Sequence, residues 1–243
     1  MLCSSLFAFC FTLSAQQSLD FEFFLGTQST GMVGTRTSEV NYWGADRYDP
    51  STDADRDYEQ YPFFRPAMGF LLNYFPGDYL GFVAGIQYSG HGYKHKSGMS
   101  GVPEDRTKEL NYLKLPVGLT IGAGEDVRFD CDLYLYPGIL LGADDNYMFT
   151  EKYGIDPSKR HQTWTFGGGV KLGLTYYIEP QVGIGIYGFG EMDFTDAEDK
   201  SASYVPWDVN EDFLYNVYHS ARGSQHNYAI GARLALHYRV FQR

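Results

Sequence analysis

The sequence has no apolar run long enough to cross a membrane as a helix. No stretch of the 243 residues approaches about 18 uninterrupted apolar residues, the length that predicts a transmembrane helix. Cysteine is also scarce: of Cys3, Cys10 and Cys131, only the last lies beyond the first 15 residues. A single thiol forms neither an internal disulfide nor a thiolate metal cage. Cys131 falls on the apolar side of its segment, which favours the role of a small hydrophobic side chain.

Positive charge and catalytic motifs are lacking as well. Lysine and arginine number 19 against 30 acidic residues, which gives a net charge of −11. No basic stripe exists, so a nucleic-acid partner is not expected. The sequence contains no nucleophile elbow, no HExxH pair and no glycine-rich phosphate loop, since the run 167–169 lies inside an alternating segment. We therefore predict no catalytic residue and no cofactor.

What the sequence does contain is strict alternation of apolar and polar residues. In the last such segment, 227–241, Tyr228, Ile230 and Leu234 alternate with Asn227, Ala229 and Arg233. This period of two predicts a β-strand with one apolar and one polar face. The same pattern recurs along the chain, and the other predicted strands are 19–26, 65–74, 80–89, 112–122, 127–136, 163–176 and 182–191.

The connections between these segments alternate in length. Tight turns are predicted at 75–78, 123–125 and 178–181, and long polar loops at about 31–62, 92–108, 145–161 and 195–224. Short turns at one end and long loops at the other are typical of outer-membrane barrels. The predicted fold is all-β, an eight-stranded antiparallel up-and-down transmembrane β-barrel. Its turns and both termini are expected to be periplasmic, and its four long loops extracellular.

A soluble barrel of the lipocalin kind, apolar inside and polar outside, is the alternative fold. Two features oppose it. Glycines such as Gly118, Gly169 and Gly231 lie on the polar face, where they would weaken a strand that faces solvent. Aromatic residues such as Trp164 and Tyr176 lie near the ends of the apolar face, as they do in the girdles of membrane proteins.

Residues 1–15 are predicted to form a secretory signal peptide, and 16–243 the barrel domain. The first 15 residues are mostly apolar and end in the small residues Ser14 and Ala15, which predicts cleavage after about Ala15. The positively charged segment that usually precedes such a run is missing, because no lysine or arginine occurs before Arg36.

Two segments carry a family resemblance. The run from Gly85 to Tyr93 (GIQYSGHGY) and the run from Asn111 to Val117 (NYLKLPV) resemble the third and fourth strands of the PorT-like outer-membrane β-barrel family. That family is an eight-stranded group common in Gram-negative Bacteroidota. The resemblance implies an integral outer-membrane location, and PorT itself is associated with protein secretion. The expected partners are outer-membrane lipid, lipopolysaccharide and secretion-machinery proteins, and the expected state is a monomer.

Charged residues on the polar faces predict the content of the lumen. Eight strands enclose a space only wide enough for side chains, so charges inside must pair with one another. The predicted lumen charge network comprises Glu22, Lys114, Arg128, Asp130, Asp132, Lys171 and Arg233, with Asp20, Arg65, Glu191 and Arg239 on the same faces. Lys114, Arg128 and Lys171 are expected to face Asp130 and Asp132. This network favours a salt-bridged plug over a proton path, an ion path or a small-solute channel.

One acidic segment is a weak candidate for a metal site. Asp53, Asp55, Asp57 and Glu59 alternate in the first long loop, and carboxylates at alternate positions can converge on Ca²⁺. The strict calcium-loop motif fails, because Tyr58 occupies the glycine position and Phe64 that of the bidentate glutamate. A solvated acidic surface is the simpler interpretation.

The function predicted from these features is non-enzymatic: structural, surface-binding or secretion-associated. An enzyme at the outer rim, acting on lipid A or on peptides, is the alternative. Its candidate residues are three histidines near strand ends, His91, His161 and His226, and their neighbours Ser89, Asp144 and Ser224. Catalysis would require a nucleophile within about 2.6–3.2 Å of its base.

Overall fold

The computed structural model describes residues 18–34, 60–61, 63–96, 105–145, 158, 161–197 and 225–242. Its elements are β1 (Ser18–Gly34), β2 (Gln60–Tyr61), β3 (Phe63–Phe75), β4 (Leu80–Lys96), β5 (Asp105–Lys114), β6 (Val117–Ala123), β7 (Val127–Asp145), β8 (Trp164–Glu179), β9 (Val182–Asp193) and β10 (Gln225–Gln242). No helix within these ranges is long and apolar enough to span a membrane. The predicted signal peptide, 1–15, lies outside the described residues, as does the acidic segment 53–59.

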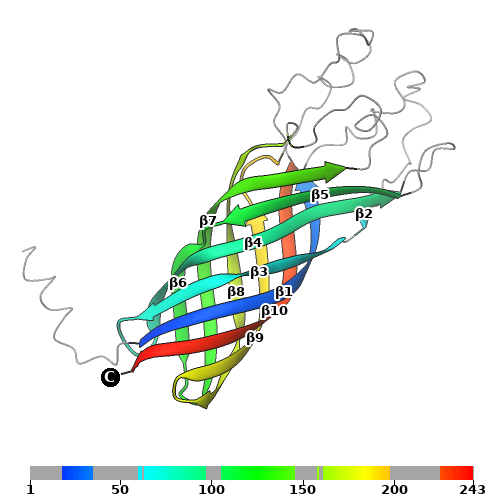
Figure 1. Ribbon diagram of the computed structural model, residues 1–243. Helices are drawn as coiled ribbons and strands as arrows, with labels where there is room; N and C mark the ends of the chain where they lie inside the picture. Colours follow the sequence, from blue (N-terminus) through cyan, green and yellow to red (C-terminus); the bar gives the residue numbers. More distant parts are fainter. Residues whose placement is uncertain are drawn as a thin grey trace, which may run out of the picture.

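The strands close into a ring in which each is antiparallel to its neighbours (Figure 1). The first and last strands seal it, because β1 pairs with β10 from Ser18↔Gln242 to Gly34↔Gln225. Both β5 and β6 lie between β4 and β7, and β2 is a two-residue pairing with β4 just before β3. The ring thus has eight positions, and it confirms the predicted all-β, eight-stranded antiparallel up-and-down barrel.

The break between β5 and β6 has a local cause. Pro116 has no backbone N–H, so it cannot donate to the ladder. Its carbonyl still accepts from Gly85 N at 3.0 Å, and Leu115 N donates to Pro137 O at 2.9 Å. The strand therefore continues in the same direction across the proline.

Apolar residues cover the outside of the barrel and polar residues fill the inside. In β8, Leu172 and Tyr176 are 47% and 57% exposed, whereas Lys171 and Thr175 are 1% and 0% exposed. The alternation predicted for this strand is confirmed, with its even-numbered side chains outward. The polarity is opposite to that of a soluble lipocalin-type barrel.

The tight turns gather at one end, which we call the turn end. They join β3 to β4, β6 to β7 and β8 to β9, at the end where β1 begins and β10 finishes (Figure 1, lower left). Tyr177 N donates to Asp126 O at 2.8 Å and Gly122 N to Tyr79 O at 2.8 Å, so neighbouring turns bond to adjacent strands. Gly124 has φ of 113°, a conformation that side chains rarely adopt, which explains the glycine there.

At the opposite end, which we call the rim end, the strands run further than predicted. β1 continues to Gly34 and β7 to Asp145. β4 reaches Lys96 and β5 begins at Asp105, so much of the segment predicted as a loop over 92–108 is strand. The alternation of apolar and polar residues fades toward the rim end, because polar residues occur there on both faces of the strands. The strands still form, because pairing between their backbones does not require an apolar face.

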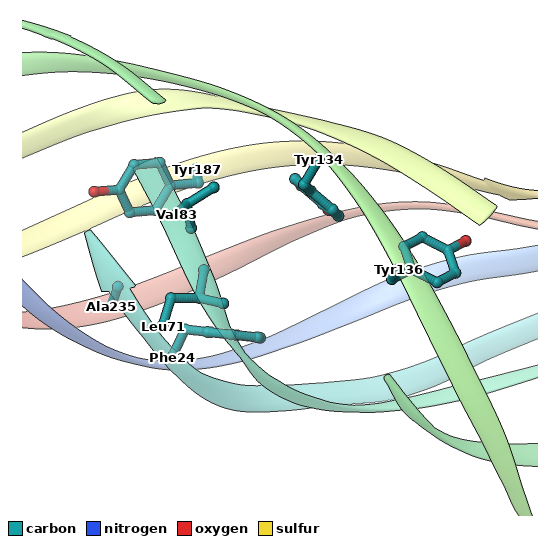
Figure 2. Close-up of a cluster of buried hydrophobic side chains, with 7 residues drawn as sticks. All are labelled: Phe24, Leu71, Val83, Tyr134, Tyr136, Tyr187 and Ala235. Carbon is teal, nitrogen blue, oxygen red and sulfur yellow. The ribbon is translucent and has the colours of Figure 1, made fainter. Parts of the chain in front are cut away.

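The buried apolar residues lie inside the lumen, among the polar ones. The cluster in Figure 2 brings side chains from six strands toward the barrel axis and consists of Phe24, Leu71, Val83, Tyr134, Tyr136, Tyr187 and Ala235. Its tyrosines combine ring packing with a hydroxyl that can reach a partner. The barrel interior is therefore a packed core held together largely by polar contacts.

Candidate functional site

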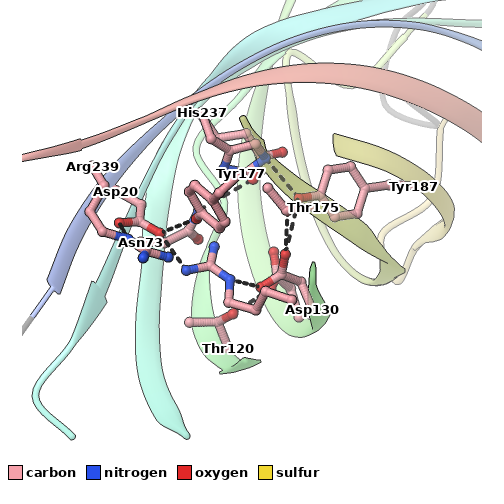
Figure 3. Close-up of polar contacts among 12 residues, drawn as sticks. Asp20, Asn73, Thr120, Asp130, Thr175, Tyr177, Tyr187, His237 and Arg239 are labelled. Atoms are coloured by element: carbon pink, nitrogen blue, oxygen red, sulfur yellow. Dashed lines mark hydrogen bonds and ion pairs between the residues drawn. The ribbon is translucent and has the colours of Figure 1, made fainter. Parts of the chain in front are cut away.

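The site that the fold builds is the charged lumen, and its first layer lies near the turn end. Asp20 and Arg239 are register partners across β1 and β10, so both side chains enter the lumen at one level. Arg239 Nε lies 3.0 Å from Asp20 Oδ1, and Arg128 from β7 pairs with Oδ2. Tyr177 donates its hydroxyl to the same oxygen at 2.8 Å (Figure 3). Two guanidinium groups and a phenol thus surround one buried carboxylate.

Arg128 links this layer to the next. Its Nε lies 2.7 Å from Asp130 Oδ1, and Asp130 Oδ2 accepts from Thr175 Oγ1 at 2.6 Å. The Tyr187 hydroxyl lies 3.1 Å from the same Asp130 oxygen and 2.7 Å from His237 Nε2 (Figure 3). Asp130 therefore connects β7 to residues of β8, β9 and, through Tyr187, β10.

The middle layer centres on Lys171. Its Nζ lies 2.6 Å from Glu22 Oε2 and 2.6 Å from Asp132 Oδ2. Asp132 and Lys171 are register partners on β7 and β8, whereas Glu22 comes from β1 across the lumen. Thr120 Oγ1 donates to Asp132 at 2.6 Å, and Asn73 Nδ2 donates to Glu22 at 3.2 Å. One lysine thus joins opposite walls of the barrel.

Arg233 occupies the same level but has looser charge contacts. Its Nε lies 4.0 Å from Glu22 Oε1. Its guanidinium group lies over the ring of Phe24 at 4.3 Å and that of Phe189 at 5.2 Å. Cation–π stacking on two aromatic faces stabilises a cation that has been removed from water.

A third layer lies toward the rim end, around Glu191. Lys114 Nζ donates to Glu191 Oε2 at 2.7 Å, and Gln87 and Tyr134 donate to Oε1 at 2.8 and 2.9 Å. Lys114 also lies 2.8 Å from His91 Nε2, and Ser89 Oγ lies 3.0 Å from that nitrogen. These contacts join four strands at one level of the lumen.

Charge is balanced within the described lumen. The buried acids number six, Asp20, Glu22, Asp130, Asp132, Glu191 and Asp193, and the buried bases also six, Lys108, Lys114, Arg128, Lys171, Arg233 and Arg239. A neutral set, in which buried acids and bases offset one another, avoids the cost of several kcal/mol that an unpaired buried charge carries. The arrangement can therefore serve as a rigid internal plug.

The structure groups the seven network residues differently from the prediction in one respect. Glu22, Asp132, Lys171 and Arg233 gather in the middle layer, and Arg128 contacts Asp130. The sequence predicts that Lys114 faces Asp130 and Asp132, but Lys114 pairs with Glu191 instead. Alternation along a strand shows whether a side chain points into the lumen, but not how far along the barrel axis it lies. It therefore cannot predict that Lys114 pairs with Glu191.

Several lumen residues were absent from the predicted network. Asp193 accepts from Tyr136 Oη at 2.9 Å and from Asn227 Nδ2 at 2.9 Å. Parity alone would have placed Asp193 inward, because it follows Glu191 by two residues. Arg65, also predicted inward, pairs with Glu109 near the rim end and donates to Asn111 Oδ1 at 2.9 Å.

The rim histidines form no triad within the described residues. Ser89 and His91 meet, but both are fully buried. His161 Nδ1 lies 3.2 Å from the carbonyl of Ala197, and His226 Nδ1 lies 3.0 Å from that of Thr195. Ser224 lies outside the described residues.

The described residues also contain no group of His, Cys, Asp or Glu placed to hold a metal ion. The predicted calcium candidates Asp53, Asp55, Asp57 and Glu59 lie outside this part of the chain, so that hypothesis stays a prediction.

Comparison with known proteins supports the fold. No protein-family model and no curated protein matches the sequence. Among solved structures, the chain is similar to the outer-membrane protein OprG of Pseudomonas aeruginosa, with 9% identity, 93% of this chain and 97% of OprG covered, and a TM-score of 0.53. The outer-membrane protease OmpT of Escherichia coli matches with 13% identity, coverage of 95% and 100%, and a TM-score of 0.44. Ail of Yersinia pestis matches with 11% identity, coverage of 93% and 99%, and a TM-score of 0.38. The likeness to OprG shows that the fold is that of an outer-membrane β-barrel.

Proposed function

We propose that this protein is an integral outer-membrane β-barrel with a non-enzymatic role: structural, surface-binding or secretion-associated. The observation that carries the proposal is the neutral set of six acids and six bases packed across the described lumen. A barrel filled in this way anchors itself through its outer wall and leaves its ends to make contacts. The proposed surroundings of that wall are outer-membrane lipid and lipopolysaccharide. The proposed oligomeric state is a monomer, because no strand edge of the closed ring is free to pair.

A secretion-associated role is the finer form of this proposal. It rests on the resemblance of the segments Gly85 to Tyr93 and Asn111 to Val117 to the PorT-like family. The two segments lie side by side, since Ser89 pairs with Tyr112 and Gln87 with Lys114. A pull-down from native envelopes would test the role. Co-purified secretion-machinery proteins would support it, and recovery of the barrel alone would favour a structural role.

The proposed orientation, with turns and termini in the periplasm, can be tested by labelling. In a Cys131→Ala background, we expect Thr163→Cys, exposed at the rim end, to react with a large maleimide polymer on intact Gram-negative cells. Asp78→Cys, exposed in the β3–β4 turn, should react only after the outer membrane has been permeabilised. The reverse pattern would show the opposite orientation. Labelling of neither site in permeabilised cells would show that the protein had not reached the outer membrane.

A small-solute channel is disfavoured by the same lumen. Arg233, Tyr187, Lys114 and Lys171 are among the largest fully buried side chains, and they fill the lumen at more than one level. We therefore expect the purified full-length protein to give conductance near zero in planar lipid bilayers. Steady single-channel steps would contradict the plug. The double variant Glu22→Gln, Lys171→Met removes an ion pair from the middle layer. Its conductance should be compared with that of the wild-type protein.

The enzyme alternative rests on one contact, that of Ser89 Oγ with His91 Nε2 at 3.0 Å. For catalysis this nitrogen would have to take the serine proton, yet Lys114 Nζ lies 2.8 Å from it. Both residues are fully buried, so a substrate would have to enter the lumen from the rim end. An altered lipid A mass spectrum or new peptidase activity on expression, lost in Ser89→Ala, would establish the enzyme over the proposed role.

A further inference from the structure

The outer wall of the barrel is interrupted by a groove of about 790 Å³. Its floor includes the backbone at Gly168 on β8 and Gly190 on β9. Both glycines lie on the outward face of their strands. Phe166 and Val170, two residues before and after Gly168, are exposed, and so is Met192, two residues after Gly190. The apolar residues that line the groove include Leu135, Val170, Met192, Phe194, Tyr228 and Ile230.

The missing side chain at Gly190 opens this groove. A Cβ atom added at Gly190 would meet no heavy atom within 4 Å, so the position opens directly to the outside. In the register of the sheet, Gly190 lies between Val170 and Ile230, whose side chains are 40% and 65% exposed. Gly168 lies between Leu135 and Met192, and an added Cβ there would meet Phe194 Cζ at 3.1 Å and Leu135 Cδ2 at 3.2 Å, so these two side chains partly cover that position. The exposed side chains of Val170 on β8 and Ile230 on β10 therefore stand on either side of the bare backbone at Gly190.

The groove reaches the border between the apolar wall and the polar rim end. Met192 and Tyr228 are register partners, and they lie close to the rim-end limits of β9 and β10. Just beyond them, His226 Nδ1 lies 3.0 Å from the carbonyl of Thr195. Thr195 Oγ1 in turn accepts from Phe166 N at 3.1 Å. A ligand in the groove would thus have apolar walls along its length and polar groups at one end.

We propose that this groove binds one acyl chain of a membrane lipid, whose headgroup lies beside Thr195 and His226. The inference rests on the proposed insertion of the outer wall into a membrane. Lipid chains offer no hydrophobic gain over the surrounding bilayer, so the preference comes from van der Waals packing against the bare backbone at Gly190 and against the side chains beside it. A polymethylene chain is narrow and flexible enough to reach that floor.

A second copy of the barrel fits the groove less well. Each strand of the closed ring already has two neighbours, so the outer wall is convex and offers no free edge to insert. Two convex walls would touch along the exposed side chains on either side and leave the floor uncovered.

Photo-crosslinking can test this binding. The full-length protein is reconstituted in vesicles of phosphatidylethanolamine and phosphatidylglycerol that contain a phosphatidylethanolamine with a diazirine-bearing acyl chain, and crosslinked residues are mapped by mass spectrometry. We expect labelling concentrated on Leu135, Val170, Met192 and Phe194, well above that of Ile184 and Leu234 elsewhere on the wall. In Gly190→Leu, labelling of the groove should fall to the level of the rest of the wall.

Ala84→Leu is the matched control, because it places the same leucine side chain at an exposed position on β4 that does not line the groove. It should leave the labelling pattern of the wild-type protein unchanged, and both variants should show the heat-modifiable band of a folded barrel. Even labelling around the wild-type wall, or crosslinks between two protein copies at the groove, would overturn the acyl-chain site while leaving membrane insertion intact. Absence of labelling from the whole outer wall would overturn the proposed function as well.

Discussion

Replacing Lys171 by methionine is expected to lower the free energy of unfolding by about 3–5 kcal/mol, the usual cost of removing one partner from a buried ion pair. Lys171 is 1% exposed, and its Nζ lies 2.6 Å from both Glu22 Oε2 and Asp132 Oδ2. Methionine fills a similar volume but leaves two carboxylates facing each other without the cation between them. Urea unfolding of the refolded protein in detergent, followed by tryptophan fluorescence, would measure the change.

A double-mutant cycle separates the charge from the packing of the lysine stem. Asp132→Asn removes one of the two carboxylates, and Glu22 keeps Arg233 at 4.0 Å as a remaining counter-charge. We therefore expect Lys171→Met with Asp132→Asn to be less destabilised than the sum of the two single variants, by about 0.5–3 kcal/mol. Simple additivity would mean that Lys171 and Asp132 do not stabilise each other, and the description of this contact as an ion pair of the middle layer would then be wrong.

The faces of the strands could be predicted from sequence because the rule involved is local. In a strand, successive side chains point to opposite sides, so one well-marked residue fixes the side of all the others. Because Leu172 points outward, its neighbour Lys171 must point inward. In the same way, outward-pointing Phe21 and Phe23 imply that Glu22, between them, points inward. The closed ring needs no further information, because eight such strands joined by alternating short and long connections have few other arrangements.

The pairing within the lumen could not be predicted, because it depends on how the strands are staggered around the barrel. Lys114 meets Glu191 through the stagger across β5, β7, β8 and β9, which no single strand encodes. The groove could not be predicted from sequence for a similar reason. Gly168 and Gly190 are separated by 21 intervening residues, and only the register Val170↔Gly190 and Gly168↔Met192 brings them to neighbouring rows of the wall.

Leu172→Arg is expected to destabilise the barrel by about 2–4 kcal/mol, the cost of an arginine on the lipid face at the bilayer midplane. Leu172 lies near the centre of β8, between Cys131 on β7 and Gly188 on β9, and 47% of its side chain is exposed on the outer wall. In water this substitution would be nearly neutral, because an exposed arginine needs no partner there. The penalty therefore reports on the surroundings of the wall and not on the packing of the barrel.

Val127→Arg provides the matched control. Val127 is 54% exposed on the same outer wall, but it is the first residue of β7, next to the turn end. The cost of arginine falls to about 0–1 kcal/mol near the membrane interface, so this variant should unfold close to the wild-type midpoint in lipid vesicles. Equal, small effects at both positions would place Leu172 in water and remove the physical basis for a membrane-spanning barrel. A large effect confined to Leu172 would locate the apolar band of the wall at the middle of the strands.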